Sequence, residues 1–185
     1  DSFFEVPLKS ELSKLKESDV NEIHVKILRS EIFEEVLNPL PPYTTDTVLS
    51  DIASYLNISA PQAMQILQDL FEMGFITYHR TDSTRVSEAG IAIAKEYLIN
   101  VLKDEYTKYY APRTWGVGGA HECIRPTRPA DAETLARLIN EGIIEPVKKL
   151  TKKHFSVYNL IFSRFIASQS RHANVVYHQV THSRQ

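Results

Sequence analysis

The segment that covers residues 76–85, Ile-Thr-Tyr-His-Arg-Thr-Asp-Ser-Thr-Arg, gathers side chains that could handle a phosphate group. A tyrosine phenol titrates near pH ~10, so Tyr78 can act as a nucleophile at neutral pH only where cations stabilise its phenolate. Arg80 lies two positions later, on the same side of an extended chain, and its planar guanidinium suits phosphate oxygens. The other polar residues that could bind phosphate oxygens or orient the cations are Thr81, Asp82, Ser83 and Arg85.

A second segment, residues 118–127, places another imidazole and another guanidinium in a glycine-rich loop. His121 and Arg125 follow two consecutive glycines, and a chain without side chains at those positions can approach a phosphate closely. Two arginines, a histidine and a tyrosine are sufficient for a phosphoryl transfer in which the protein holds the cleaved end covalently. We therefore expect Arg80, His121 and Arg125 to converge on one anion site beside the Tyr78 hydroxyl.

Each of these residues also has a purely structural interpretation. Tyr78 could be a packed strand residue, Arg80 and Asp82 could form a surface ion pair, and His121 and Arg125 could simply pin a loop. Taken one at a time, the structural interpretation is favoured in every case. Two polar clusters beside one conventional helical unit shift the balance modestly towards a functional site.

The elements that must hold these segments are mostly helical. An apolar stripe between the N-cap Ser59 and the stop signal Gly74 predicts a helix that leads into a short β segment at 75–78. Helix, turn, helix, glycine and strand is the order of a winged helix-turn-helix, so we expect a mainly α fold with short β segments. Many domains of unrelated function share that order. Further elements are expected as helices after Thr44–Asp46 and Ser87, helices over roughly 131–140 and 152–168, and a loop over 112–129.

Strand-like runs flank the helical region. The pattern of residues 1–36 predicts a strand, a polar link and a second strand, and residues 175–180 form another strand-like run. The prolines around 38–42 indicate a domain boundary. Because the chain begins and stops inside such runs, we expect it to be a segment of a longer polypeptide. The expected division is a first β pass at 1–38, a helical domain at 39–168 and a return strand at 169–185.

Composition and charge set broader limits. The 185 residues suffice for one sizeable domain, and Cys123, the only cysteine, excludes an internal disulfide and a cysteine-based zinc site. No apolar run approaches the roughly 20 residues that a membrane-spanning helix needs, so we expect no membrane partner and a cytoplasmic location. The net charge is −2, but residues 1–110 carry 10 Lys and Arg against 18 Asp and Glu, whereas residues 111–185 carry 11 against 5. This asymmetry permits a basic face within an acidic whole.

Four motifs resemble those of a known family. Residues 75–83, Phe-Ile-Thr-Tyr-His-Arg-Thr-Asp-Ser, resemble the active-site signature of the type IA DNA topoisomerases, and residues 120–127, Ala-His-Glu-Cys-Ile-Arg-Pro-Thr, resemble their second motif. Residues 41–47, Pro-Pro-Tyr-Thr-Thr-Asp-Thr, and residues 158–165, Tyr-Asn-Leu-Ile-Phe-Ser-Arg-Phe, are similar to two further segments of these enzymes. The four motifs occur in the family's order, which makes the resemblance specific.

Within that family, the chain resembles the reverse gyrases. His79, together with Thr84-Arg85-Val86-Ser87, is typical of that subfamily, whereas methionine is commoner at the His79 position in the bacterial enzymes. Cys123 departs from the family pattern, in which many members carry alanine. Both residues are small and apolar, so we interpret Cys123 as a packing residue.

The resemblance implies a mechanism and roles for the residues. Tyr78 would attack single-stranded DNA and form a transient 5′-phosphotyrosyl bond. The DNA strand would later be rejoined as this bond breaks, and the cycle would change DNA supercoiling. Arg80 would stabilise the developing charge, His121 and Arg125 would position the scissile phosphate, and Asp82 would orient one of these cations. The further residues expected to contact DNA are Thr81, Asp82, Ser83 and Arg85.

The resemblance also implies cofactors and partners. The family's Mg²⁺ site and leaving-group acid belong to a separate acidic domain, and the ATP site of a reverse gyrase belongs to a helicase-like part, so we expect this chain to bind neither Mg²⁺ nor ATP. The flanking strands would be two passes of a β hinge domain. Expected partners are single-stranded or underwound DNA and the other domains of the same polypeptide. The complete protein is expected to be an isomerase associated with the nucleoid. The 185-residue chain alone is expected to be inactive.

Three alternatives stay open at this point. The chain could be a non-catalytic winged-helix module that reads DNA with the helix at 61–73, although that helix carries glutamines and acids and no Lys or Arg. It could be a module that only packs against partner domains. It could also belong to a bacterial-type topoisomerase I or III in place of a reverse gyrase.

Overall fold

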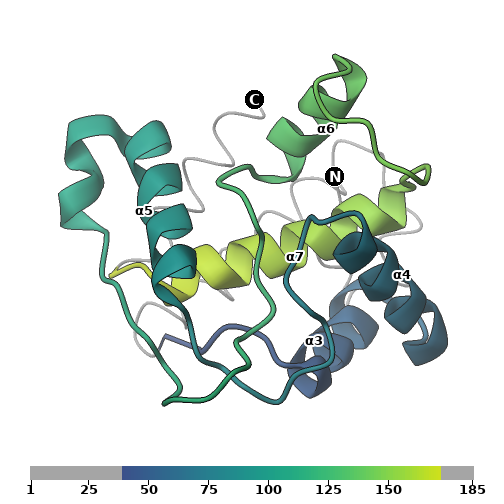
Figure 1. The fold of residues 1–185 in the computed structure, drawn as a ribbon, viewed down its shortest axis with the longest axis horizontal. Coiled ribbons are helices and arrows are strands. Elements are labelled where there is room, and N and C mark those ends of the chain that lie inside the picture. The colour runs from purple at the N-terminus through teal and green to yellow at the C-terminus, as the bar shows by residue number, and fades with distance from the viewer. Residues whose placement is uncertain (1–38, 172–185) are drawn as a thin grey trace, which may run out of the picture.

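The computed structural model describes residues 39–171 (Figure 1). The expected hinge segments at 1–38 and 169–185 lie outside this part of the chain, apart from residues 169–171. The described region is mainly helical, as the sequence predicts. Its helices are α3 (Thr45–Asp51), α4 (Ala60–Glu72), α5 (Glu88–Leu102), α6 (Ala132–Asn140) and α7 (Lys152–Ser168), with a π-helical turn η1 (Ile52–Leu56) and a 3₁₀ turn η2 (Lys103–Lys108). None of these helices is long and apolar enough to cross a membrane.

Local capping signals determine where the helices begin. The first turn of a helix leaves backbone N–H groups without partners, and a side-chain oxygen of the N-cap residue accepts a hydrogen bond from one of them. The residues that do so here are Thr44, Ser59, Ser87, Asp131 and Thr151. Helix α4 ends where Gly74 adopts a left-handed backbone with φ of +78°. The sequence predictions for α4, α5, α6 and α7 are thus confirmed to within one or two residues.

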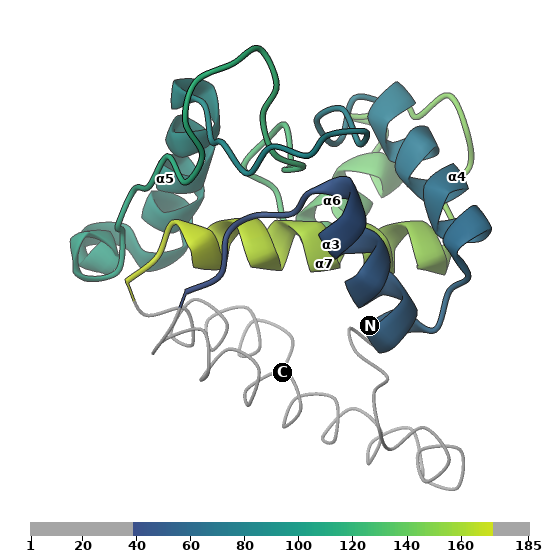
Figure 2. The same ribbon diagram turned by 90° about the horizontal axis from the view of Figure 1, so that it is seen from below.

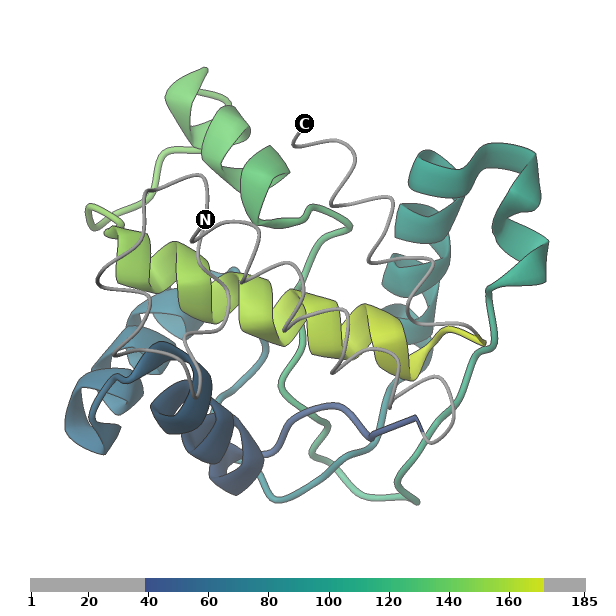
Figure 3. The same cartoon turned by 180° about the vertical axis from the view of Figure 1, so that it is seen from behind.

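Helix α7 is the central element of the described region. It runs through the middle of the molecule, with α3 and α4 on one side, α5 on the other and α6 above it (Figures 1 and 3). Aliphatic and aromatic side chains from the surrounding helices pack on it, and burial of this apolar surface is the main favourable contribution to folding. The largest fully buried side chains include Leu67, Leu70, Leu98, Leu135, Ile161 and Phe165.

The segment between α4 and α5 and the segment between η2 and α6 run side by side (Figure 2). In residues 39–171 β pairing is limited to isolated antiparallel bridges, one of which joins Ile76 to Pro126. The ladder goes no further because the Arg125 N–H donates to the Thr77 hydroxyl at 2.9 Å, whereas a regular ladder would need the Thr77 carbonyl as acceptor. The expected β segment at 75–78 is therefore reduced to a single bridge.

A buried ionic cluster joins α4 to the start of α7. Asp69 accepts hydrogen bonds from His154 Nε2 at 2.9 Å and from Lys148 Nζ at 3.0 Å. The Thr151 backbone N–H donates to His154 Nδ1, so Nε2 carries the proton that His154 shares with Asp69. Burial alone would raise the pKa of Asp69, but hydrogen bonds from His154, Lys148 and Gln65 outweigh it and lower the pKa from 3.8 to about 2.

We expect Asp69→Asn to reduce the free energy of unfolding at neutral pH by about 2 kcal/mol, because each unit of pKa shift corresponds to about 1.4 kcal/mol. Since the folded-state pKa lies below the unfolded one, this contribution is complete above pH ~4 and disappears as the pH falls towards the folded-state pKa of about 2. Chemical denaturation of both proteins at neutral and acidic pH measures the difference. The control is Glu72→Gln, which removes the exposed second partner of Lys148 and should change stability very little. An Asp69→Asn effect of equal size at both pH values would contradict this account.

Candidate functional site

Thr77 joins the two polar segments that the sequence singles out. Its N–H donates to the Arg125 carbonyl at 2.9 Å, and its hydroxyl donates to the Cys123 carbonyl at 2.7 Å and accepts from the Arg125 N–H. Phe75 and Ile76 before it are buried. Thr77 thereby holds together backbones that lie 46 and 48 residues apart in the sequence. The two segments are neighbours in space, as the phosphate hypothesis requires.

Tyr78 follows this joint and points outwards. Its side chain is 46% exposed, and its hydroxyl forms no hydrogen bond within residues 39–171. The ring rests against Phe71, at the end of α4, with 5.0 Å between ring centroids. Alternation along an extended chain explains the orientation, since the half-buried Thr77 side chain bonds to the second segment and the next side chain faces away. An accessible phenol on a fixed backbone is what an attacking nucleophile needs.

Thr45, the first residue of α3, clamps the backbone on either side of Arg80. Its hydroxyl donates to the His79 carbonyl at 2.6 Å and accepts from the Thr81 N–H at 2.9 Å, and its N–H donates to the Thr81 carbonyl at 2.9 Å. The Arg80 side chain itself is exposed. The sequence places Thr45 in a family-like motif without a role, and its position as a backbone clamp emerges only from the fold.

The hydroxyls expected to contact phosphate mostly serve the local turn. The Thr81 hydroxyl accepts from the Ser83 N–H and the Ser83 hydroxyl accepts from the Arg85 N–H, each at 3.1 Å. These are short-range side-chain to backbone bonds that shape the chain between Arg80 and α5. Asp82 is exposed and forms no ion pair with a cation in the described part of the chain. Its expected role in orienting one of the cations stays a prediction.

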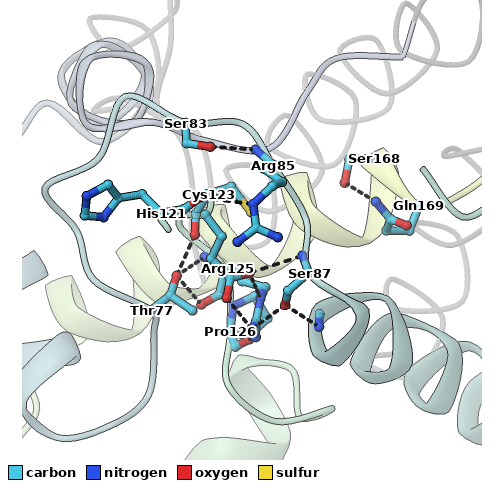
Figure 4. Close-up of polar contacts among 12 residues, drawn as sticks. Thr77, Ser83, Arg85, Ser87, His121, Cys123, Arg125, Pro126, Ser168 and Gln169 are labelled. Atoms are coloured by element: carbon cyan, nitrogen blue, oxygen red, sulfur yellow. Dashed lines mark hydrogen bonds and ion pairs between the residues drawn. The ribbon is translucent and has the colours of Figure 1, made fainter. Parts of the chain in front are cut away.

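Arg85 and the glycine-rich loop form a second contact between the segments. The Arg85 Nε donates to the His121 carbonyl at 3.2 Å, and the Cys123 N–H donates to the Arg85 carbonyl at 2.8 Å. Gly116 packs directly on Arg85, so closely that a Cβ there would lie 2.9 Å from the Arg85 backbone nitrogen. Glycine is needed at position 116 for this approach. His121 is exposed, and its ring points away from the neighbouring guanidiniums (Figure 4).

Arg125 does not join the anion site that the sequence predicts. Its guanidinium is buried and forms a two-point ion pair with Glu122, at 2.7 Å from Nε and 3.0 Å from Nη2. It also donates to the Pro126 carbonyl at 2.9 Å and to the Ser87 hydroxyl at 3.3 Å. A guanidinium with these partners holds the loop against the start of α5 (Figure 4) and is not directed at a ligand in solvent. These contacts give Arg125 a structural role, and its expected contact with DNA phosphate stays a prediction.

Two neighbours complete this buried ion pair. Gly90 on α5 leaves the space that the guanidinium fills, since a Cβ at Gly90 would lie 2.7 Å from Arg125 Nε. Glu122 also accepts from the Ser87 N–H at 3.4 Å. Burial alone would raise the pKa of Glu122, but the hydrogen bond and charge of Arg125 outweigh it and lower that pKa, so the carboxylate is ionised at neutral pH.

Cys123 is fully buried beside this pair, and burial raises the pKa of its thiol to about 12. A thiol in that state is not a nucleophile at neutral pH, in agreement with its interpretation as a packing residue. No group of three or more His, Cys, Asp or Glu side chains in residues 39–171 is arranged to hold a metal ion.

The chain is similar to known topoisomerases along most of its length. Residues 5–185 match the family model described as DNA topoisomerase. Reverse gyrase 2 of Sulfurisphaera tokodaii is 58% identical over 147 residues, which cover 80% of this chain and 12% of that protein. The reverse gyrase of Pyrococcus furiosus is 54% identical over 159 residues, which cover 86% of this chain and 13% of that protein. The chain thus spans about an eighth of the length of these curated relatives.

A solved structure has a related fold. Full-length topoisomerase I from Thermotoga maritima superposes with a TM-score of 0.54 and is 32% identical, over 72% of this chain and 21% of that one.

The buried ion pair leads to a prediction that separates Arg125 from His121. Arg125→Ala leaves Glu122 partly buried without its partner, so we expect it to lower the free energy of unfolding by about 3 kcal/mol. His121→Ala removes an exposed ring and should change stability very little. Urea denaturation of the two variants and the wild type measures both effects. Small and equal effects would contradict the structural role of Arg125.

Proposed function

Because this chain belongs to the family of type IA DNA topoisomerases, we propose that it carries the nucleophile of a reverse gyrase and that Tyr78 cleaves single-stranded DNA. The observation that carries the proposal is the Thr77 joint. It joins the residue before the outward-facing Tyr78 to the backbone of Cys123 and Arg125, in the same loop as His121. The identity to reverse gyrases of more than half the aligned residues supports the subfamily over a bacterial-type topoisomerase I or III.

In the proposed reaction, the Tyr78 hydroxyl oxygen attacks the phosphorus of a DNA phosphodiester. The new bond from oxygen to phosphorus forms as the bond to the 3′ oxygen breaks, the phenol gives up its proton, and the 3′ oxygen gains one. The DNA is left with a free 3′ hydroxyl and a 5′-phosphotyrosyl bond. The reverse steps reseal the strand after its supercoiling has changed.

Two exposed basic side chains on the joined segments would stabilise the negative charge that develops on the phosphate. Arg80 lies two residues from the nucleophile on a clamped backbone, and His121 extends from the loop that Thr77 and Arg85 hold in place. Fixed cations need no reorganisation when charge develops on the transferring phosphoryl group, which is why they lower the barrier. Arg85 and the Thr81–Ser83 turn would meet the neighbouring DNA backbone.

The proposed enzyme also needs Mg²⁺ and ATP, whose binding sites we place outside the described residues. The described residues contain no group of three or more His, Cys, Asp or Glu side chains arranged to hold a metal ion. We propose that other domains of the full-length polypeptide bind Mg²⁺ and ATP, and that the enzyme works in the cytoplasm on nucleoid DNA. We also propose that α3, α4 and residues 75–77 form a winged-helix-like unit, with the bridge from Ile76 to Pro126 as the start of the wing.

The rival reading of α4 as a DNA-recognition helix finds less support. Gln65 donates to Asp69 at 3.0 Å, Gln62 accepts from Lys153 at 3.3 Å, and Asp69 is itself buried in the cluster with His154. Polar side chains that could read a groove are thus engaged within the protein, and the helix offers no cation to DNA phosphates.

Replacing Tyr78 by Phe in the full-length enzyme should abolish the covalent adduct with DNA. Loss of one exposed hydroxyl removes the nucleophile without disturbing the fold, so binding of a single-stranded oligonucleotide should persist. Denaturing gel electrophoresis of protein mixed with labelled oligonucleotide detects the adduct, and a binding titration provides the control. A phenylalanine variant that still becomes covalently attached would refute the proposal and leave the non-catalytic DNA-binding module as the better explanation.

Arg80→Ala and His121→Ala should each slow cleavage far more than they lower the melting temperature. Losing a donor that acts mainly in the transition state typically costs on the order of 3 kcal/mol of barrier, whereas exposed side chains contribute little to stability. The rate of adduct formation at saturating oligonucleotide and the thermal unfolding curve are measured on the same preparations. Lys108→Ala, in the exposed pair with Glu105, is a control for loss of a surface cation. If Lys108→Ala slows adduct formation as much as Arg80→Ala and His121→Ala do, the roles assigned to Arg80 and His121 are wrong.

A further inference from the structure

Three aromatic rings meet at Tyr78. The Tyr78 ring lies 5.0 Å from that of Phe71 and 5.4 Å from that of His79, and the latter two are 5.9 Å apart, all measured between centroids. The Tyr78 and His79 rings meet edge to face, with 71° between their planes, a favourable geometry for aromatic pairs. Two rings from different elements therefore limit the rotation of the phenol. Phe71 belongs to the last turn of α4, and His79 follows Tyr78 in the chain.

His79 is an unusual residue in this position. Its side chain is completely buried, and neither ring nitrogen has a hydrogen-bond partner among the described residues. Nearly all buried polar side-chain atoms have a partner, because an unpaired one loses its hydration without compensation. A phenylalanine would fill the same space without that cost. Packing stability therefore does not account for histidine beside the nucleophile.

We propose that His79 is a positioning residue for Tyr78: its neutral imidazole, together with Phe71, holds the phenol in the orientation for attack, and protonation of the imidazole releases the phenol. This inference rests on the function proposed above. It makes the state of a buried ring, and not only the cations at the surface, a condition for cleavage.

The charges around His79 support the neutral state. Burial is the largest cause that lowers the pKa of His79 below 6.5, and the adjacent Arg80 acts in the same direction. Glu72 at the end of α4 is the charged group that acts in the opposite direction. The imidazole is therefore neutral at neutral pH. In acid, a charged ring would have to stay buried without a hydrogen-bond partner beside the Arg80 cation, or leave its place next to Tyr78.

Adduct formation by the full-length enzyme at saturating single-stranded oligonucleotide tests the proposal. At neutral pH, His79→Ala and His79→Gln, which remove the ring, should slow the reaction by about 10- to 100-fold with unchanged oligonucleotide affinity, because misplacement of a reacting group has costs of this order. His79→Phe, which keeps a ring, should restore most of the rate. As the pH is lowered below 6.5, the wild-type rate should fall relative to that of His79→Phe, which cannot be protonated.

A second variant keeps the test independent of folding at the buried position. Phe71 is 36% exposed, so Phe71→Ala should fold normally and still slow adduct formation. Ile99→Ala on α5, matched to it by an exposure of 37%, should not.

Several outcomes would overturn the inference. They are a wild-type rate for His79→Ala or for Phe71→Ala, a loss for His79→Phe as large as that for His79→Ala, or the same acid dependence in His79→Phe as in the wild type. A wild-type enzyme that forms no adduct at any pH is a different result. It overturns the proposed function, and this inference with it.

Discussion

The three hydrogen bonds of Thr77 fix the register on which the rest of the site depends. They pair Thr77 with the backbone of Cys123 and Arg125 and bury Ile76 against Pro126. Successive side chains of an extended segment point to opposite faces, so a shift of one residue would turn Tyr78 inwards. A threonine suits the joint, because its hydroxyl can donate and accept at once while its backbone N–H forms the third bond. The phenol of Tyr78 is accessible because the Thr77 side chain before it is turned towards the second segment.

Further ties hold the segments around this joint to the helices. Arg164 of α7 donates to the Pro41 carbonyl at 2.8 Å and to Asp51 at 3.2 Å, and its guanidinium stacks on the Tyr43 ring at 4.5 Å. Tyr43 forms an isolated bridge with Ile124. The four family-like motifs are therefore connected to one another, and many of their polar residues serve the scaffold. The exposed residues of the two polar segments include Tyr78, Arg80, Asp82 and His121.

Much of this arrangement could be predicted from local signals, and the remainder depends on distant contacts. Helix α4 could be placed because Ser59 caps it and Gly74 ends it, both through bonds within a few residues. The proximity of the two polar segments could be predicted because a transferring phosphoryl group needs basic side chains on more than one side. The burial of Arg125 could not be foreseen, since it needs the Ser87 hydroxyl 38 residues away and the space above Gly90. An arginine pattern has the same appearance in sequence whether the guanidinium faces solvent or a carboxylate.

The division between fixed and free groups is consistent with a reversible cleavage. A strand that is cut and resealed needs its phosphorus to stay within reach of two oxygens in turn, so the group that carries it must not drift between the two steps. Thr45 and Thr77 restrain the backbone on either side of Tyr78, and the ionic cluster of Asp69 and His154 anchors α4, whose Phe71 meets the phenol. The Tyr78 side chain can then rotate only about its own bonds, and the rings of Phe71 and His79 limit that rotation. Under the proposed function, the scaffold thus limits the motion of the phosphotyrosyl group to the small rotation that attack and resealing require.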